Sequence, residues 1–152
     1  MKERCLVLIK PDALEKRLAG MILDRLERLE LDVVAAKAVT PTENLIRAHY
    51  QHLAGKPFLE SVVRYMMGDY NPGAQRKILA FVLQGEDAVA KIRHAVGVTN
   101  PDNAAPWTVR GIFGKFDKPA DIVYNCVHAS DNAQDAQREI ALWFKPEEVL
   151  DA

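Results

Sequence analysis

The chain has 152 residues, of which 49% are hydrophobic and 27% are charged. This length and composition predict one globular domain over residues 1–152, large enough for a substantial core. The formal net charge of −1 argues against a general nucleic-acid or membrane-surface binder, because no overall positive field would hold a polyphosphate backbone. Any anionic ligand must therefore be held by a local cluster of cations.

The first apolar run extends from Cys5 to Ile9 and is too short for a signal-peptide core or a membrane span. Cys5 and Cys126 lie in apolar runs without metal-ligand spacing, so we interpret both as small core residues in a reducing compartment. We therefore expect a cytoplasmic protein.

Cys5 to Ile9 is apolar at every position, which predicts a buried central strand. We expect Asp12 to cap the helix that follows. The apolar stripe of that helix consists of Ala19, Ile22, Leu26 and Leu29. Val33 to Val39 then predicts a second strand.

Thr40-Pro41-Thr42-Glu43 predicts a capping box with proline at the first helical position. The buried side of this helix would carry Leu45, Ile46, Tyr50 and Leu53. A further helix is expected from about Phe58 to Met67. The polar segment from Gly68 to Lys77 predicts a surface loop.

Ile78 to Leu83 predicts another buried strand, and a helix should begin at Glu86 or Asp87 and run towards Val96. Gly97 to Gly114 is a long stretch with prolines and glycines, and such loops in compact domains are usually functional. The last strand is expected at Ala120 to Val127 and the last helix at Asp131 to Phe144.

The resulting order is β-α-β-α-α-β-α-loop-β-α. It predicts an α+β fold with a ferredoxin-like βαββαβ core and added helices. The sheet would be antiparallel and would bury one face under the long helices.

His128 is the most informative candidate for chemistry. It lies in NCVHASD (125–131), where an apolar strand gives way to a Ser-Asp pair that starts a helix, and Glu139 lies on that helix. A helix N-terminus favours an anion, and imidazole is a nucleophile at neutral pH. This pattern favours phosphoryl transfer through a phosphohistidine; the alternative is a structural or solvated histidine.

No Walker-type phosphate loop is present, because Gly55-Lys56 lacks both the earlier glycine and the following Ser or Thr. His49 and His52 do not have zinc spacing with any partner, and we interpret them as the polar face of a helix. Bound phosphates would therefore meet side chains.

Lys10 is the first candidate for a phosphate ligand, because it ends a buried strand and would project from the core. Arg93, Thr99 and Arg110 flank the long loop and complete the candidate set. Taken singly, each of these residues is also compatible with a solvated charge or a helix cap.

Six segments together resemble the nucleoside diphosphate kinase family over nearly the full length of the chain. They occur in the family's order at close to its spacings, which makes the match specific. The segments are VLIKPDA (7–13), HYQHLAGKPF (49–58), IRHAVGVTNP (92–101), APWTVRGIFG (105–114), NCVHASD (125–131) and REIALWF (138–144).

The resemblance implies ping-pong transfer of a γ-phosphate from a nucleoside triphosphate to a different nucleoside diphosphate, with Mg²⁺ as cofactor and broad base specificity. The partners would be nucleoside di- and triphosphates, with no membrane or nucleic acid. A homo-oligomer, either a tetramer or a hexamer, is also implied.

The resemblance implies four catalytic positions, namely His128, Glu139, Lys10 and Tyr50, and a supporting position at Ser130. His128 matches the nucleophile, which in the family attacks through its δ nitrogen, and Glu139 matches the carboxylate that holds the ring. Tyr50 matches a hydroxyl near the histidine and the Lys10 head group. Ser130 matches the serine that bonds the glutamate.

Other positions match the family's nucleotide contacts. Asn125 matches the residue that bonds the sugar hydroxyl, and Phe58 matches the ring on which the base stacks. Asp12 matches an acidic residue to which we give a structural role. The phosphate ligands implied by the match are Lys10, Arg93, Thr99 and Arg110.

The chain departs from the family's pattern in several places. Trp107 replaces a glycine and could shift Arg110, although an aromatic patch outside the loop is the simpler interpretation. Ile112 replaces an aspartate, which suggests extra apolar burial. Arg17 stands at a common glycine position and cannot readily adopt positive φ, so the first helix should begin differently.

Two insertions, around 68–75 and 115–120, fall in predicted turns and leave both oligomeric states open. The main rival function is a nucleotide-binding module that keeps the pocket without turnover. A third interpretation, an interaction protein that uses the core as a scaffold, gives no reason for the six collinear matches.

Overall fold

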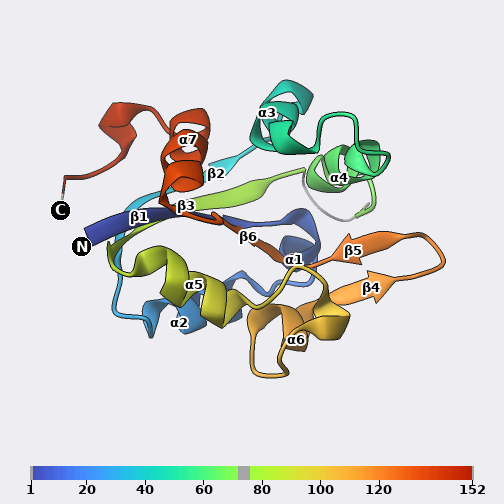
Figure 1. The fold of residues 1–152 in the computed structure, drawn as a ribbon, viewed down its shortest axis with the longest axis horizontal. Helices are drawn as coiled ribbons and strands as arrows, with labels where there is room; N and C mark the ends of the chain where they lie inside the picture. Colours follow the sequence, from blue (N-terminus) through green and yellow to red (C-terminus); the bar gives the residue numbers. More distant parts are fainter. Residues whose placement is uncertain (1, 72–75, 152) are drawn as a thin grey trace.

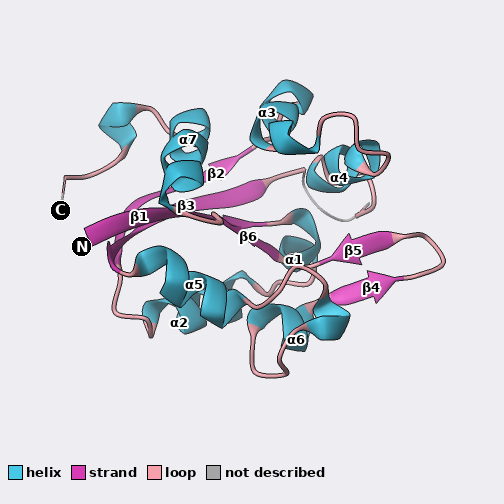
Figure 2. Cartoon of the chain, in the orientation of Figure 1, coloured by secondary structure: helices cyan, strands magenta, loops and turns pink. Residues whose placement is uncertain are grey.

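The computed structural model describes residues 2–71 and 76–151. Its centre is a four-stranded antiparallel sheet with the order β2-β3-β1-β6 (Figure 1 and Figure 2). The strands are β1 (Lys2–Ile9), β2 (Asp32–Val39), β3 (Ile78–Glu86) and β6 (Val127–Ala129). Because β1 and β3 are central, with β6 beside β1 and β2 beside β3, the predicted α+β, ferredoxin-like core is confirmed.

Helices cover both faces of this sheet, so the prediction that only one face is buried was wrong (Figure 1). Cys5, Val7 and Ile9 pack in one apolar layer, whereas Leu6 and Leu8 pack in the other. Successive side chains of a strand point to opposite faces, so a central strand that is apolar throughout is buried on both sides.

Different helices cover the two faces of the sheet. On one side lie α2 (Ala19–Glu27) and α5 (Ala88–Val96). On the other side lie α3 (Glu43–His49), α4 (Leu59–Met66) and α7 (Ala133–Trp143).

The longest helix among the described residues is α7, with 11 residues. No helix in the described part of the chain is both long enough and apolar enough to cross a membrane.

The helices expected near residues 58–67, 87–96 and 131–144 are confirmed as α4, α5 and α7 within one or two residues at each end. The expected irregular stretch from Gly97 to Gly114 contains a 3₁₀ turn, Pro101–Asn103, and the short helix α6 (Val109–Phe113). In the predicted loop 68–77 and its insertion, residues 72–75 lie outside the described residues.

The predicted last strand is broken into two. β5 (Ile122–Tyr124) pairs with β4 (Lys115–Asp117) in a separate hairpin, so part of the expected turn at 115–120 is a strand. Cys126 has φ +68° and separates the hairpin from β6. Its N–H donates to Asp12 Oδ2 over 3.2 Å, and its carbonyl accepts from the Lys10 N–H over 2.8 Å. Contacts with a distant segment therefore impose the break.

Helix α3 begins two residues later than expected. The Leu45 N–H donates to Thr42 Oγ1 over 3.2 Å, which makes Thr42 the N-cap instead of Thr40. The helix ends at His49; Tyr50 follows as its C-cap, and Leu53 lies in the 3₁₀ turn Gln51–Leu53.

The segment after β1 forms two helices, α1 (Pro11–Glu15) and α2, instead of one. Asp12 lies inside α1 and does not cap it, so that expectation was wrong. Arg17 lies between the helices with φ +56°, contrary to the expectation that arginine would avoid this region. The exposed Arg17 thus occupies the left-handed conformation that suits the glycine common in the family.

We predict that Arg17→Gly raises the free energy of unfolding by about 0.5–1 kcal/mol, because relief of the left-handed strain exceeds the extra chain entropy of glycine. The measurement is urea unfolding followed by circular dichroism. Arg17→Ala is the matched control, since it removes the same side chain but keeps the strain. An equal gain in both variants would contradict this assignment.

Candidate active site

One cavity of about 620 Å³ opens beside the end of β1 and gathers residues from both helical layers. Every residue predicted to contact the nucleotide or the reacting atoms lines it. They are Lys10, Tyr50, Phe58, Arg93, Thr99, Arg110, Asn125, His128 and Glu139. Ser130 lies behind Glu139 and is fully buried. The tertiary fold therefore brings together residues that span most of the sequence.

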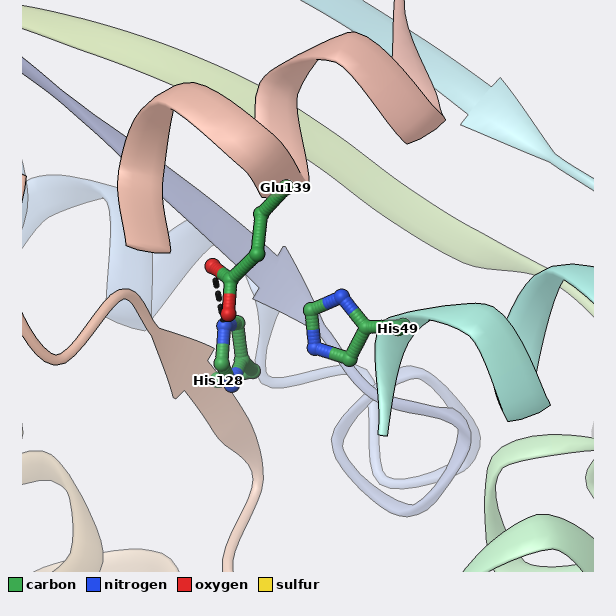
Figure 3. Close-up of side chains that lie close together, drawn as sticks. All are labelled: His49, His128 and Glu139. Carbon is green, nitrogen blue, oxygen red and sulfur yellow. Dashed lines mark hydrogen bonds and ion pairs between the residues drawn. The ribbon is translucent and has the colours of Figure 1, made fainter. Parts of the chain in front are cut away.

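His128 lies on the short strand β6, opposite Leu8 of β1. Its Nε2 is 2.9 Å from Glu139 Oε2, and Figure 3 shows the carboxylate descending from α7 onto the edge of the ring. Ser130 Oγ donates to the same Glu139 oxygen over 2.7 Å and accepts from the Leu6 N–H over 3.1 Å. This chain of bonds fixes the carboxylate, and through it the imidazole.

The imidazole of His128 is neutral. Burial lowers its pKa well below the ordinary value, and the nearby cations Lys10, Arg110 and Arg93 lower it further. A neutral ring that meets a carboxylate at Nε2 carries its proton there, which leaves the lone pair on Nδ1. Among the described residues, no side chain or backbone group is hydrogen-bonded to Nδ1.

Lys10 is a buried cation held by two different contacts. Its Nζ donates to Asn125 Oδ1 over 2.7 Å and lies 5.2 Å from the centre of the Tyr65 ring. Burial, followed by the repulsion of Arg110, lowers the pKa of Lys10 to about 7. An anion placed in the cavity would favour the ammonium form.

Arg110 is held by backbone carbonyls at the inner end of its loop. Its two terminal amines donate to the carbonyls of Gly97 and Val127, each over 2.7 Å. Its Nε is buried and has no partner among the described residues, and burial lowers the pKa of its guanidinium. Arg93 is more exposed and is paired with Asp131 at the cavity wall.

Asn125 connects the long loop to the hairpin. Besides accepting from Lys10, it donates through Nδ2 to the Thr99 carbonyl over 3.1 Å. The hydroxyl-bearing ring of Tyr50 is buried and lies edge-on to His128 at a centroid distance of 6.3 Å. Phe58 lies at the rim with 47% of its surface exposed, so one ring face is available to a planar ligand.

Tyr65 is a residue of this site that the sequence analysis did not identify. Its hydroxyl donates to Asp12 Oδ1 over 2.6 Å beneath Lys10. Asp12, with its second oxygen on the Cys126 N–H, thus ties α1, α4 and the β5–β6 break together. The structural role implied for Asp12 is consistent with these bonds.

His49 was wrongly interpreted as part of a polar helix face. It is completely buried, its Nδ1 accepts from Trp143 Nε1 over 3.1 Å, and its ring meets that of His128 edge-to-face at 4.4 Å. The bond to the indole of Trp143 satisfies one nitrogen of this buried histidine, and helical periodicity does not reveal so distant a partner. His52 is exposed, but it lines the cavity.

Comparison with known proteins identifies the family. A family model described as nucleoside diphosphate kinase matches residues 3–149. The nucleoside diphosphate kinase of Eremothecium gossypii is 42% identical over 149 residues, which cover 98% of this chain and 91% of that protein. The chain belongs to the nucleoside diphosphate kinase family.

Solved structures agree with this membership. The nucleoside diphosphate kinase of Borrelia burgdorferi, a transition-state mimic with bound vanadate and ADP, has a TM-score of 0.87 at 30% identity and covers 99% of this chain and 92% of that chain. The Halobacterium salinarum enzyme in complex with CDP has a TM-score of 0.86 at 33% identity, covering 100% and 93%. The chain is thus a phosphotransferase with the fold of this family.

The two loop departures from the family's pattern lie outside the cavity. Trp107 is 63% exposed, and its carbonyl accepts from an amine of Arg25 over 3.1 Å. Ile112 is 43% exposed, so the expectation of extra apolar burial at this position was wrong. Thr108 caps α6 by accepting from the Gly111 N–H over 3.0 Å, and Arg110 lines the cavity. These contacts favour the interpretation of Trp107 as an outer aromatic residue.

The nitrogens of His49 and His128 and an oxygen of Glu139 lie within 4.8 Å of one another, close enough for a metal site to be considered. Two features weigh against it. Glu139 Oε2 already meets both Ser130 and His128, and the positive charges of Lys10 and Arg110 would oppose a second cation. We therefore interpret His49 and Glu139 as residues that hold the His128 ring in place.

We predict that Tyr65→Phe lowers the free energy of unfolding by about 1–3 kcal/mol, because the buried Asp12 carboxylate loses a hydrogen-bond donor. Urea unfolding measures the change. Tyr70→Phe, which removes a hydroxyl from a less buried ring, is the control and should be near neutral. Equal effects in the two variants would count against the Tyr65–Asp12 bond.

We also predict that the free energy of unfolding rises with pH because of Lys10. Burial lowers the pKa of its ammonium group to about 7 in the folded protein, against 10.5 for an ordinary lysine. Between these values the unfolded chain binds more protons, so stability rises with pH by at most about 1.4 kcal/mol per unit. Lys10→Met should lack this rise. Parallel stability curves for the two proteins from pH 7 to 10 would refute the prediction.

Proposed function

We propose that this protein transfers the γ-phosphate of a nucleoside triphosphate to a nucleoside diphosphate through a phosphohistidine on His128. The observation that carries the proposal is a neutral imidazole, bonded at Nε2 by Glu139, inside a cavity lined by Lys10, Arg93 and Arg110. This is a nucleophile placed among groups that bind phosphate oxygens.

In the first half-reaction, the lone pair of His128 Nδ1 forms a bond to the γ-phosphorus. The bond from phosphorus to the β–γ bridging oxygen breaks, and the diphosphate leaves with that electron pair. In the second half-reaction, a terminal oxygen of another diphosphate attacks the phosphorus and the N–P bond breaks. Nδ1 recovers its lone pair, so the enzyme returns to its starting state.

The protein's contribution to each step is positioning and charge. Phosphoryl transfer develops charge on the oxygens of the moving group and needs little covalent assistance. Arg110 lines the cavity with a guanidinium that two backbone carbonyls hold in place, and Arg93 can exchange Asp131 for phosphate. Glu139 stabilises the positive charge that the imidazole acquires when Nδ1 is phosphorylated.

Broad base specificity is part of the proposal. Phe58 presents a ring face at the rim, and stacking does not distinguish one base from another. Asn125 would meet the sugar hydroxyl, which all substrates share. The two relatives described above are bound to different nucleotides, ADP in one and CDP in the other. We assign Tyr50 the role of the hydroxyl near His128, and Thr99 the role of a phosphate ligand, as the resemblance implies.

The residues of the cavity fit Mg²⁺ that is held mainly by the nucleotide. The carboxylates that line it are already engaged: Glu139 with His128, Asp131 with Arg93, and Asp135 with Asn132. Mg²⁺ usually keeps several waters and is bound through substrate phosphates, so a dedicated carboxylate cage is unnecessary. When bound, the ion would neutralise charge on the β- and γ-phosphates.

A cytoplasmic homo-oligomer remains part of the proposal. Large exposed side chains near the long loop, namely Val98, Trp107 and Ile112, offer apolar surface that an assembly would bury. Tetramer and hexamer both stay open. Sedimentation equilibrium would distinguish them, and a monomer would contradict the expectation.

We predict that incubation with γ-labelled ATP and Mg²⁺ produces an acid-labile, alkali-stable label on the protein, which a chase with GDP moves to GTP. His128→Ala should abolish labelling, whereas Ala in place of the exposed His94 should not. Lys10→Ala and Arg110→Ala should weaken transfer by removing cations from a desolvated site. Glu139→Gln should be milder, because an amide can still hold the ring.

Two outcomes would contradict the proposal. Label that persists in a folded His128→Ala protein would exclude the phosphohistidine. A wild-type protein that binds ADP but takes up no label would be the nucleotide-binding module considered as the rival function.

A further inference from the structure

His49 is a buried imidazole whose backbone and ring are both held by α7. Trp143 Nε1 donates to its Nδ1 over 3.1 Å. The guanidinium of Arg138 donates to the carbonyls of Ala48 and His49, each over 3.2 Å. The same helix carries Glu139, so one rigid element fixes both neighbours of the His128 ring.

These contacts determine where the proton of His49 lies. An indole N–H only donates, so Nδ1 of His49 accepts and carries no proton. Burial lowers the pKa of His49 to about 2, and the nearby His128 contributes to the shift. A neutral imidazole has one N–H, and in His49 that group is therefore at Nε2.

The Nε2–H of His49 is buried without a hydrogen-bond partner among the described residues. A buried donor of this kind calls for an explanation. The rings of His49 and His128 are 4.4 Å apart and inclined at 81°. Figure 3 shows a nitrogen-bearing edge of His49 turned towards His128, while the carboxylate of Glu139 reaches the edge of the same imidazole. An N–H directed at an aromatic face is a weak but real hydrogen bond.

We propose that His49 is a positioning residue for phosphoryl transfer: its N–H edge rests on the face of His128 and fixes the plane of that imidazole. Glu139 bonds the ring at its edge, and His49 supports it at right angles to that bond. Together the two contacts prevent the ring from turning about its side-chain bond. Nδ1 then keeps one direction towards the cavity, which is the orientation that a near-attack geometry requires. This inference rests on the proposed role of His128 as the phosphoryl carrier.

The variant that tests this contact is His49→Phe, which keeps a flat buried ring and removes the N–H. It also leaves the Trp143 N–H without an acceptor. The second variant, His49→Phe/Trp143→Phe, therefore removes the indole N–H together with the imidazole, so that no unpaired polar group remains at either position. His94→Phe is the control, because His94 is an exposed histidine on α5. The charged and titratable groups facing His128 stay the same in all three: Glu139, Lys10, Arg110, Arg93, His52 and Tyr50.

Two readouts are taken on folded protein. The first is the ¹⁵N spectrum of the His128 ring across a pH titration, which reports its tautomer and pKa without any turnover. The second is the single-turnover rate of phosphoenzyme formation from γ-labelled ATP, together with the dissociation constant for ADP. We expect both His49 variants to show a mixture of His128 tautomers and a rate about tenfold to a hundredfold lower, with ADP affinity unchanged. The His94→Phe protein should match the wild type.

The outcomes separate this inference from the proposed function. Wild-type tautomer and rate in the folded double variant would overturn the positioning role. A rate that falls only in proportion to the unfolded fraction would also overturn it, since His49 would then be a packing residue. If the wild-type protein forms no phosphoenzyme but the His128 spectrum still changes in the variants, the contact stands and the proposed function fails.

Discussion

The bond between the buried carboxylate of Glu139 and Nε2 of His128 is the interaction on which the rest of the site depends. A carboxylate that is only 3% exposed is stable because Ser130 and His128 both bond it. Ser130 in turn accepts from the backbone of β1, so this carboxylate adds a polar connection between the sheet and α7 to their apolar packing. The bond also assigns the proton of the neutral imidazole to one nitrogen and leaves the other available for chemistry.

Two buried cations lie near this bond, and burying them lowers the stability of the folded protein. Lys10 and Arg110 are both buried, and each lowers the stability of the other's charged form. Asn125, the Tyr65 ring and two backbone carbonyls hold these cations in place without neutralising them. A bound polyphosphate would supply the missing negative charge. Binding of an anion would therefore lower the electrostatic free energy of the cavity, as expected of a preorganised site.

Backbone strain also serves the site. Cys126 has positive φ between β5 and β6, and this break turns Asn125 towards Lys10 and Thr99. The strained residue is held from both sides, by Asp12 at its N–H and by Lys10 at its carbonyl. Positions of this kind persist when surrounding contacts over-determine them. Asp12 and Tyr65 do not contact a ligand in this account. They fix the backbone at Cys126 and thereby the position of Asn125, whose side chain lines the cavity.

The sequence by itself determined the elements with strong local signals: the apolar strand β1, the helices α4, α5 and α7, and the placement of Lys10 at the end of β1. The strand before His128 was expected to end at Val127, whereas β6 runs from Val127 to Ala129 and carries His128 at its centre. Period and capping residues encode such features within a few neighbouring positions. Only the tertiary structure decided that His49 is buried against Trp143, that Tyr65 meets Asp12, and that Arg17 and Cys126 adopt positive φ. These features depend on partners far away in the chain, which satisfy a buried polar group or compensate a strained backbone, and local patterns carry no record of such partners.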